Sequence, residues 1–260
     1  MDLGLRGRRA LVTGASKGIG FACAETLAAE GCDLVLVSRT EADLRAAQAR
    51  IRAASDVAVE VRALDLGHGA SADALAAEFP ETDILVNNAG AIPGGSLDQV
   101  DEARWRAAWD LKVFGYVNMC RRFHALMRDR GRGVVVNVIG AAGESPDAGY
   151  IAGTAGNASL MAFTRALGGA SPEGGVRVVG INPGPILTDR LETLLRGRAQ
   201  AALGDAERWR EMMAAMPFGR AGRPQEVAAL AAFLASDLSG YTSGTVVTVD
   251  GGAANRRKAF

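Results

Sequence analysis

The sequence predicts an α/β protein with a single-domain Rossmann fold, in which a doubly wound parallel sheet is covered by helices on both faces. Short apolar β-type runs alternate with helical stretches along the chain, which is the pattern of successive βαβ units. Most of these runs are continuously apolar, as expected for strands buried on both faces. A glycine-rich turn joins the first run to the first helical stretch. Because α/β folds of 260 residues are often one unit, we expect a single domain over residues 1–260.

Each predicted strand is a β-type run, and each predicted helix is a longer stretch between two runs. The runs, in chain order, are Arg9–Thr13, Asp33–Ser38, Val57–Arg62, Ile84–Asn87, Gly133–Val138, Val176–Ile181 and Thr245–Val249. The helical stretches are Ile19–Ala29, Glu41–Ala54, Ala72–Phe79, Arg104–Arg130, Ala155–Leu167 and Gln225–Ala235.

Two regions break the alternation: 91–99 after the fourth run and 186–218 after the sixth. Both leave the carboxyl ends of predicted strands, where open α/β sheets bind their ligands. We interpret 186–218 either as a substrate lid or as a region of surface packing or oligomer contact.

The composition excludes several classes of function. The 29 basic and 29 acidic residues balance, so no excess charge attracts nucleic acid or an anionic membrane surface. Cys23, Cys32 and Cys120 are too few and too scattered for a disulfide framework or a metal cluster, and we expect no metal. No apolar run reaches the roughly 18 residues of a membrane span. In the absence of a secretory segment, we expect a cytoplasmic protein.

The first strand leads directly into a turn that is suited to bind phosphate. The turn reads Thr13-Gly14-Ala15-Ser16-Lys17-Gly18-Ile19-Gly20, and a helix follows at once. Glycines permit a tight turn and let the backbone approach a pyrophosphate, while the helix N-terminus offers free N–H groups and the positive end of its dipole. In this strand–turn–helix context the turn predicts a dinucleotide-binding site.

The end of the second strand indicates which dinucleotide is bound. A carboxylate there would hydrogen-bond a ribose 2′-hydroxyl and repel a 2′-phosphate. The chain has no acid at this point: Ser38 can donate to a phosphate, Arg39 can bind one through its guanidinium, and Lys17 of the glycine turn lies close. The alternative is that Lys17 and Arg39 are solvated surface cations. We favour NADP(H) over NAD(H).

These features, with others further along, resemble the short-chain dehydrogenase/reductase family over almost the whole chain. The landmarks are the Thr13–Gly20 turn, Asp65, Asn87-Asn88-Ala89-Gly90, Tyr150, Asn182-Pro183-Gly184 with Thr188, and Asp250-Gly251-Gly252. The resemblance implies a seven-stranded parallel sheet and hydride transfer between a nicotinamide and a small carbonyl or alcohol substrate. It also implies a homodimer or homotetramer that packs through two long helices.

The resemblance assigns roles to individual residues. A residue like Asp65 holds the adenine ring, the Asn-Ala-Gly segment packs under the cofactor, and the Pro-Gly segment with Thr188 positions the nicotinamide amide. The candidate cofactor-binding residues are Gly14, Ser16, Lys17, Gly18, Ile19, Gly20, Ser38, Arg39, Asp65, Leu66, Asn88, Ala89, Gly90, Lys112, Tyr150, Pro183, Gly184, Ile186 and Thr188.

The family's catalytic residues are only partly present. The family uses an Asn, a Ser, a Tyr and a Lys: the tyrosine exchanges a proton with the substrate oxygen, and the lysine four residues later binds the ribose and lowers the tyrosine pKa. Tyr150 is present, but Thr154 occupies the lysine position. Gly140 occupies the serine position, because this chain reads Asn-Val-Ile-Gly where the family usually reads Asn-Ile-Ser-Ser.

A lysine occupies the asparagine position. In the family this asparagine lies seven residues after a helix tryptophan and three before a glycine, which places Lys112 there between Trp105 and Gly115. A free phenol has a pKa of about 10, and a cation within ~4–6 Å lowers that value. We hypothesise that Lys112 replaces the missing lysine from a different helix. The alternative is a surface lysine on a helix face.

Three functions remain open at this point. The leading interpretation is an NADP(H)-dependent oxidoreductase with Tyr150 as acid/base and Lys112 as its cation. The absence of the usual serine and lysine makes a catalytically weak or inactive cofactor-binding sensor or scaffold the second. A non-redox lyase or isomerase with Tyr150 as base is the third.

Overall fold

The computed structural model describes residues 2–256 and contains a seven-stranded sheet of order β3-β2-β1-β4-β5-β6-β7. All of its strand pairs are parallel, which confirms the predicted fold class. The strands are β1 (Arg9–Thr13), β2 (Asp33–Ser38), β3 (Val59–Ala63), β4 (Ile84–Asn87), β5 (Gly133–Val138), β6 (Val176–Pro183) and β7 (Val246–Val249). The helices are α1 (Gly18–Ala29), α2 (Glu41–Ala54), α3 (Gly69–Glu78), α4 (Glu102–Trp109), α5 (Gly115–Asp129), α6 (Ile151–Ala170), α7 (Asp189–Leu203) and α8 (Pro224–Ala235).

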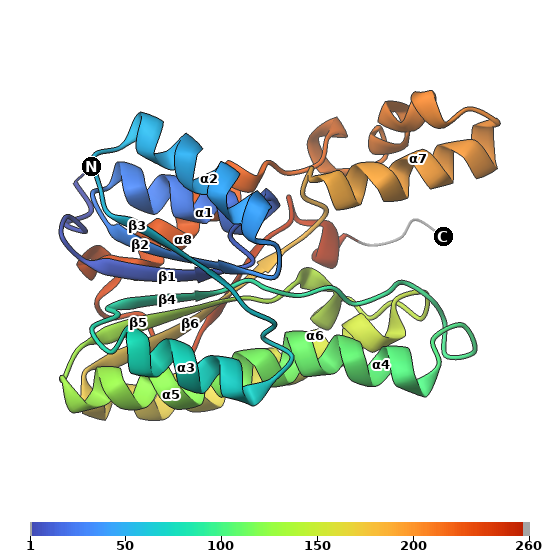
Figure 1. Ribbon diagram of the computed structural model, residues 1–260. Coiled ribbons are helices and arrows are strands. Elements are labelled where there is room, and N and C mark those ends of the chain that lie inside the picture. The colour runs from blue at the N-terminus through green and yellow to red at the C-terminus, as the bar shows by residue number, and fades with distance from the viewer. Residues whose placement is uncertain (1, 257–260) are drawn as a thin grey trace.

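Helices cover both faces of the sheet, with α1, α2 and α8 on one side and α3, α5 and α6 on the other (Figure 1). The packing of strand β2 explains why its residues are continuously apolar. Leu34 and Leu36 pack into the cluster under the first layer, whereas Val35 and Val37 pack into the cluster under the second. Because side chains alternate across a strand, burial on both faces requires every position to be apolar.

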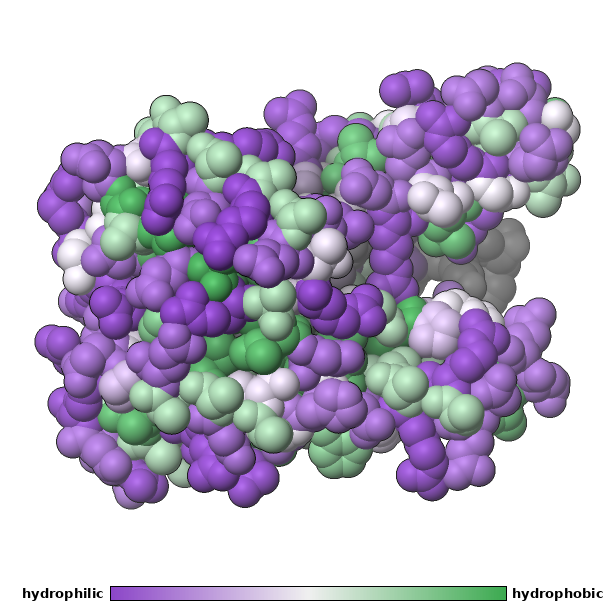
Figure 2. Space-filling view, in the orientation of Figure 1, coloured by the Kyte–Doolittle hydropathy of each residue, from purple (hydrophilic) through white to green (hydrophobic). Residues whose placement is uncertain are grey.

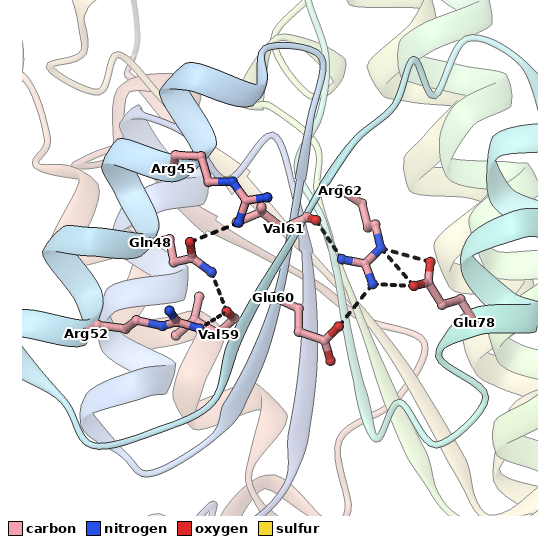
Figure 3. Close-up of polar contacts among 8 residues, drawn as sticks. All are labelled: Arg45, Gln48, Arg52, Val59, Glu60, Val61, Arg62 and Glu78. Atoms are coloured by element: carbon pink, nitrogen blue, oxygen red, sulfur yellow. Dashed lines mark hydrogen bonds and ion pairs between the residues drawn. The ribbon is translucent and has the colours of Figure 1, made fainter.

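The edge strand β3 is held by side chains from neighbouring helices (Figure 3). Gln48 and Arg52 of α2 both donate to the Val59 carbonyl, at 2.5 and 2.8 Å. On the same strand Arg62 forms ion pairs with Glu60 and with Glu78 of α3. These contacts give hydrogen-bond partners to polar groups at a sheet edge and fix the strand beside β2.

The largest departures from the predicted boundaries are at α6 and in the long helix before β5. Helix α6 begins at Ile151 rather than Ala155, although Gly153 and Thr154 are weak helix formers. The ring of Tyr150 occupies the space where a Cβ of Gly153 would lie, so tertiary packing overrides local propensity. The predicted helix Arg104–Arg130 is interrupted by a π-helical turn, Asp110–Phe114.

Region 186–218 forms a helical unit that projects beyond the sheet (Figure 1). Helix α7 packs on the 3-10 helix Ala206–Met213 through Leu195, Ala199 and Trp209. This small cluster is separate from the two under the sheet. Within residues 2–256, no helix has the length and apolar character needed to cross a membrane.

Candidate functional site

The site begins at the point where the strand order reverses. Strand β1 lies between β2 and β4, and ligands of doubly wound sheets bind in the crevice at this switch point. The hydroxyl of Thr13 accepts hydrogen bonds from the backbone N–H groups of Asn88 and Ala89, at 2.8 and 3.0 Å. The Asn88 amide donates back to the carbonyls of Thr13 and Gly14. The glycine turn and the segment after β4 are therefore fixed to each other.

The turn is made of backbone because side chains do not fit there. A Cβ on Gly14 would lie 2.8 Å from Asn88 Nδ2, and one on Gly20 would lie 2.2 Å from the Gly14 carbonyl oxygen. Gly14 and Gly18 have φ values of +63° and +59°, which only glycine adopts readily. Thr188 Cγ2 lies 3.2 Å from where a Gly18 Cβ would be, so the start of α7 faces the turn. This places the N-terminus of α1 in a crevice suited to a pyrophosphate.

The end of β2 offers donors and no acid. The hydroxyl oxygen of Ser38 is buried and has no hydrogen-bond partner among residues 2–256. Lys17 and Arg39 are exposed, and neither forms an ion pair within the same residues. A buried hydroxyl without a partner is costly unless a ligand meets it. These three residues fit a 2′-phosphate.

After β3, Asp65 and Leu66 lie where an adenine site is expected. Asp65 is exposed, and its Oδ1 accepts a hydrogen bond from the Gly67 N–H at 2.9 Å. Leu66 is buried in the cluster under α3 and α5. The Asp65 side chain thus shapes the loop at this edge, and its exposed carboxylate faces solvent.

Lys112 is buried in the crevice rather than on a helix surface. It lies in the π-helical turn Asp110–Phe114, and only 8% of the residue is exposed. Its stem crosses Gly90, where a Cβ would lie 2.4 Å from the Lys112 Cδ. Its Nζ donates to the carbonyl of Val138 at 2.8 Å and to the hydroxyl of Tyr116 at 2.7 Å. The surface-lysine alternative is therefore wrong.

Burial changes the protonation of this group. Burial, followed by the positive charge of Arg190, lowers the pKa of Lys112 to about 7. Lys112 therefore loses its charge as pH rises through neutrality. Burial raises the pKa of Tyr116 well above its usual value, so Tyr116 stays a neutral phenol, which donates to the Val138 carbonyl at 2.7 Å.

Tyr150 lies at the start of α6 with its ring over Gly153. It packs against the apolar cluster that contains Ile92 and Trp105. Within residues 2–256 no hydrogen bond joins Tyr150 to Lys112. Both instead contact the segment after β4, Tyr150 through its β-bridge with Gly95 and Lys112 through Gly90.

Gly140 and Thr154, which the resemblance aligned with the family's serine and lysine, have other contacts in this fold. Gly140 has a φ of +144°, and a Cβ there would lie 2.7 Å from Asn157 Nδ2, so no side chain fits without rearrangement. The hydroxyl of Thr154 accepts from the Asp147 N–H at 3.2 Å and donates to the Asp147 carbonyl at 3.3 Å. Thr154 thus fixes the loop before α6.

The third side of the crevice comes from β6 and α7. Pro183 ends β6, and the backbone of Gly184 packs against Asp250. Ile186 is buried beside Gly222, with which it forms an isolated β-bridge. Thr188 caps α7 by accepting from the Leu191 N–H at 3.4 Å.

Three features of this site escape the sequence analysis. Tyr116 lies one helical turn after Lys112, and that spacing alone would have paired the two side chains. The π-helical turn has no residue signature. Arg190, which donates to the carbonyl of Ile92, is one arginine among many, and only the tertiary structure distinguishes it.

Comparisons with known proteins agree with this geometry. A sequence profile of the family described as enoyl-(acyl carrier protein) reductase matches residues 14–254. 2-Keto-3-deoxy-L-fuconate dehydrogenase of Xanthomonas campestris is 32% identical over 254 residues, which cover 96% of this chain and 81% of that protein. Cis-4-hydroxycyclohexanecarboxylate dehydrogenase of Sinomonas cyclohexanicum is 38% identical over 255 residues, which cover 94% and 96%.

A solved structure extends the agreement to the whole fold. L-Sorbose reductase from Gluconobacter frateurii, crystallised with NADPH and L-sorbose, superposes with a TM-score of 0.92 at 30% identity. The superposition covers 99% of this chain and 100% of that one. From the profile, the relatives and the fold together, the chain belongs to the short-chain dehydrogenase/reductase family.

Proposed function

We propose that this protein is an NADP(H)-dependent oxidoreductase that interconverts a small carbonyl compound and its alcohol, with Tyr150 as acid/base and Lys112 as the assisting cation. The observation that carries the proposal is the burial of Lys112 against Gly90 and Val138, inside the crevice. The dinucleotide, when bound, supplies or accepts the hydride. The relatives' names, which include a keto sugar acid, a hydroxycyclohexanecarboxylate and L-sorbose, support a small-molecule substrate.

In the reductive direction Tyr150 gives a proton to the carbonyl oxygen, and in the oxidative direction it takes the proton from the alcohol. A positive charge nearby stabilises the phenolate that forms when the proton leaves. Lys112 holds that charge only while it is protonated, which its pKa of about 7 limits to neutral and lower pH. The carbonyl of Val138 keeps the Lys112 ammonium in place.

The 2′-phosphate of NADP(H) is assigned to the end of β2. Ser38 supplies a buried hydroxyl without a protein partner, and Lys17 and Arg39 supply two cations without carboxylate partners in residues 2–256. The NADPH bound in the L-sorbose reductase structure supports the same preference. The remaining contacts follow the glycine turn, Asp65, the segment after β4 and the end of β6.

Two features of the whole chain belong to the same proposal. Residues 1–260 act as one catalytic unit, and the α7 region, 186–218, acts as its substrate lid because Thr188 already lies against the glycine turn. The protein assembles as a homodimer or homotetramer. An apolar groove of about 420 Å³ along α4, with Leu97 and Phe114 exposed at its rim, supports this assembly.

The experiment is NADPH consumption with a panel of small aldehydes and ketones, followed across pH. Tyr150→Phe is expected to lower kcat by at least ~100-fold, because positioned proton transfer contributes about that much. Lys112→Met is expected to lower it by about 100-fold at pH 6.5 and to remove the fall in rate above about pH 7. Tyr241→Phe, at a fully exposed tyrosine, serves as the control and leaves kcat unchanged.

Two outcomes would contradict parts of the proposal. Unchanged turnover in Lys112→Met, with Tyr150→Phe inactive, removes the role of Lys112. Turnover that does not depend on the redox state of the cofactor favours a lyase or isomerase.

A specific observation favours a second candidate, a weak or inactive cofactor-binding protein. Gly140 has no room for a hydroxyl-bearing side chain, and the Thr154 hydroxyl is engaged with Asp147. Loss of one preorganised donor to a developing oxyanion costs about 3 kcal/mol. Tight NADPH binding without consumption across the panel would establish this candidate instead.

A further inference from the structure

Arg190 joins the α7 region to the active-site loop. It is the second residue of α7, and its guanidinium donates to the carbonyl of Ile92, which lies 98 positions earlier in the chain. Ile92 belongs to the loop that follows β4 and packs in the cluster with Tyr150. Arg190 therefore places a positive charge at the loop whose apolar cluster packs against Tyr150, the proposed acid/base. Figure 2 shows a hollow between the α7 region and the part of the molecule below it.

A second cationic side chain contacts the same loop. Lys112 contacts Gly90, two residues before Ile92, and the charge of Arg190 contributes to the low pKa of Lys112. Two cationic side chains that repel each other are thus held near one crevice. Such an arrangement favours binding of an anion between or beside them.

Among the described residues, no acidic side chain forms an ion pair with Arg190. Ten other arginines form ion pairs with Asp or Glu within residues 2–256, and Arg190 is not among them. A guanidinium has five N–H donors in a fork that fits a carboxylate, and a single hydrogen bond to a backbone carbonyl uses only one of them. Arg190 is exposed, and most of its donors are free to bind a ligand.

We propose that Arg190 is a specificity residue that binds a carboxylate on the substrate, so that the protein acts on small hydroxy or oxo acids. This inference rests on the proposed function and narrows its substrate class. Arg190 exchanges its bond to the Ile92 carbonyl for a bidentate pair with the substrate carboxylate. Because Tyr150 packs against the cluster that contains Ile92, the bound acid would lie on the same side of the crevice as the proton-transferring tyrosine.

The start of α7 lies beside the pyrophosphate turn, but the guanidinium of Arg190 contacts a different segment from those assigned to the cofactor phosphates. The residues assigned to the 2′-phosphate end β2, and the pyrophosphate turn follows β1. Arg190 instead contacts the loop after β4, on the other side of β1 from β2. The anion it binds is therefore assigned to the substrate, and cofactor affinity is measured as a separate outcome.

The test uses a pair of ligands that share a shape and differ in charge. Cyclohexanecarboxylate and cyclohexanecarboxamide are titrated by calorimetry into the full chain saturated with NADP⁺. The wild type is expected to bind the carboxylate at least tenfold more tightly than the amide. Arg190→Met is expected to lose at least tenfold in carboxylate affinity and nothing in amide or NADPH affinity. Arg190→Lys keeps part of the preference, because an ammonium pairs with a carboxylate only as a point charge.

Arg198→Met, at an exposed arginine on the same helix, is the matched control and retains the wild-type preference. The inference is overturned by equal affinity of the wild type for both ligands, by no measurable carboxylate binding, or by a preference that survives in Arg190→Met. A matching loss of NADPH affinity in Arg190→Met would assign the residue to the cofactor and overturn it as well. A wild type that fails to bind NADPH contradicts the proposed function itself.

Discussion

At the residue scale, the adenosine end of the crevice depends on single side chains that stand on a rigid backbone. Arg39 and Lys17 are exposed cations, whereas the hydroxyl oxygen of Ser38, next to Arg39 in the chain, is buried. An exposed cation with no acidic partner has little effect on stability, and its removal should leave the fold intact. Such a cation contributes to the free energy of ligand binding, and only when the ligand carries a phosphate.

Arg39→Met should therefore change selectivity between cofactors. NADPH affinity is expected to fall about tenfold, and NADH affinity to change less than twofold, because only NADPH carries the phosphate that Arg39 would bind. Quenching titrations with both dinucleotides measure the two constants, and Arg198→Met is the control. Equal losses for both cofactors would show that Arg39 does not contact the 2′-phosphate.

Site residues can be recognised in the sequence where their role depends on neighbouring positions in the chain. The glycine turn is recognisable because its function is performed by consecutive backbone groups, and Gly14, Gly18 and Gly20 all meet close neighbours as expected. The position of Lys112 is also predictable from spacing along one helix. Its partners are not: the Val138 carbonyl and Arg190 come from distant segments, and only packing brings them to the lysine.

At the element scale, strand β5 and the turn after it determine which side chains can occupy position 140. The strand ends at Val138, whose carbonyl accepts hydrogen bonds from Lys112 and from Tyr116. Two residues later Gly140 takes a φ of +144° against Asn157. The backbone after β5 is therefore shaped around a residue with no side chain, and this turn has no room for the serine that the resemblance implies there.

A serine introduced at position 140 should not raise turnover. Gly140→Ser is expected to lower the free energy of unfolding by about 1–3 kcal/mol, because it combines a strained φ with a clash against Asn157, and to leave turnover no higher than that of the wild type. Thermal or urea unfolding and kcat are the measurements. Gly169→Ser, at a helical glycine with open space, is the control. A Gly140→Ser variant that is as stable as the wild type and faster would refute this account.

The boundaries of strands and helices are predictable where composition sets them and not where tertiary contacts do. Strands β1, β2, β4 and β5 begin and end where their apolar runs do, since burial on both faces leaves a clear composition. Helix α6 begins four residues before its prediction because Tyr150 and Trp109 cover Gly153 and Gly156. The π-helical turn at Lys112 accommodates an extra residue, and such turns often occur at functional sites.

At the scale of the whole molecule, one surface carries apolar side chains that the fold does not bury. Leu97 and Phe114 are 64% and 52% exposed beside Trp105 and Trp109 on α4. Such a groove marks a site of association when it is contiguous. The assembly implied by the family resemblance would cover it with a second copy of the chain.

Phe114→Glu should weaken that assembly. Sedimentation equilibrium is expected to find the wild type as a dimer or tetramer at micromolar concentration and to show at least a tenfold rise in the dissociation constant for the variant, because a charge would be buried at the contact. Leu238→Glu, at another exposed leucine, is the control. A monomeric wild type, or a variant that assembles as the wild type does, would place the contact elsewhere.

The packing of Lys112 across Gly90 also constrains how this chain can change over generations. A short asparagine at 112 would leave the volume beside Gly90 empty and withdraw a donor from the Val138 carbonyl, and a larger residue at 90 would collide with the lysine stem. An asparagine at 112 and a side chain at 90 are therefore each unfavourable in this chain, as cavities and overpacking both destabilise. A lysine at 112 thus requires a glycine at 90, so descendants that keep the lysine should also keep the glycine.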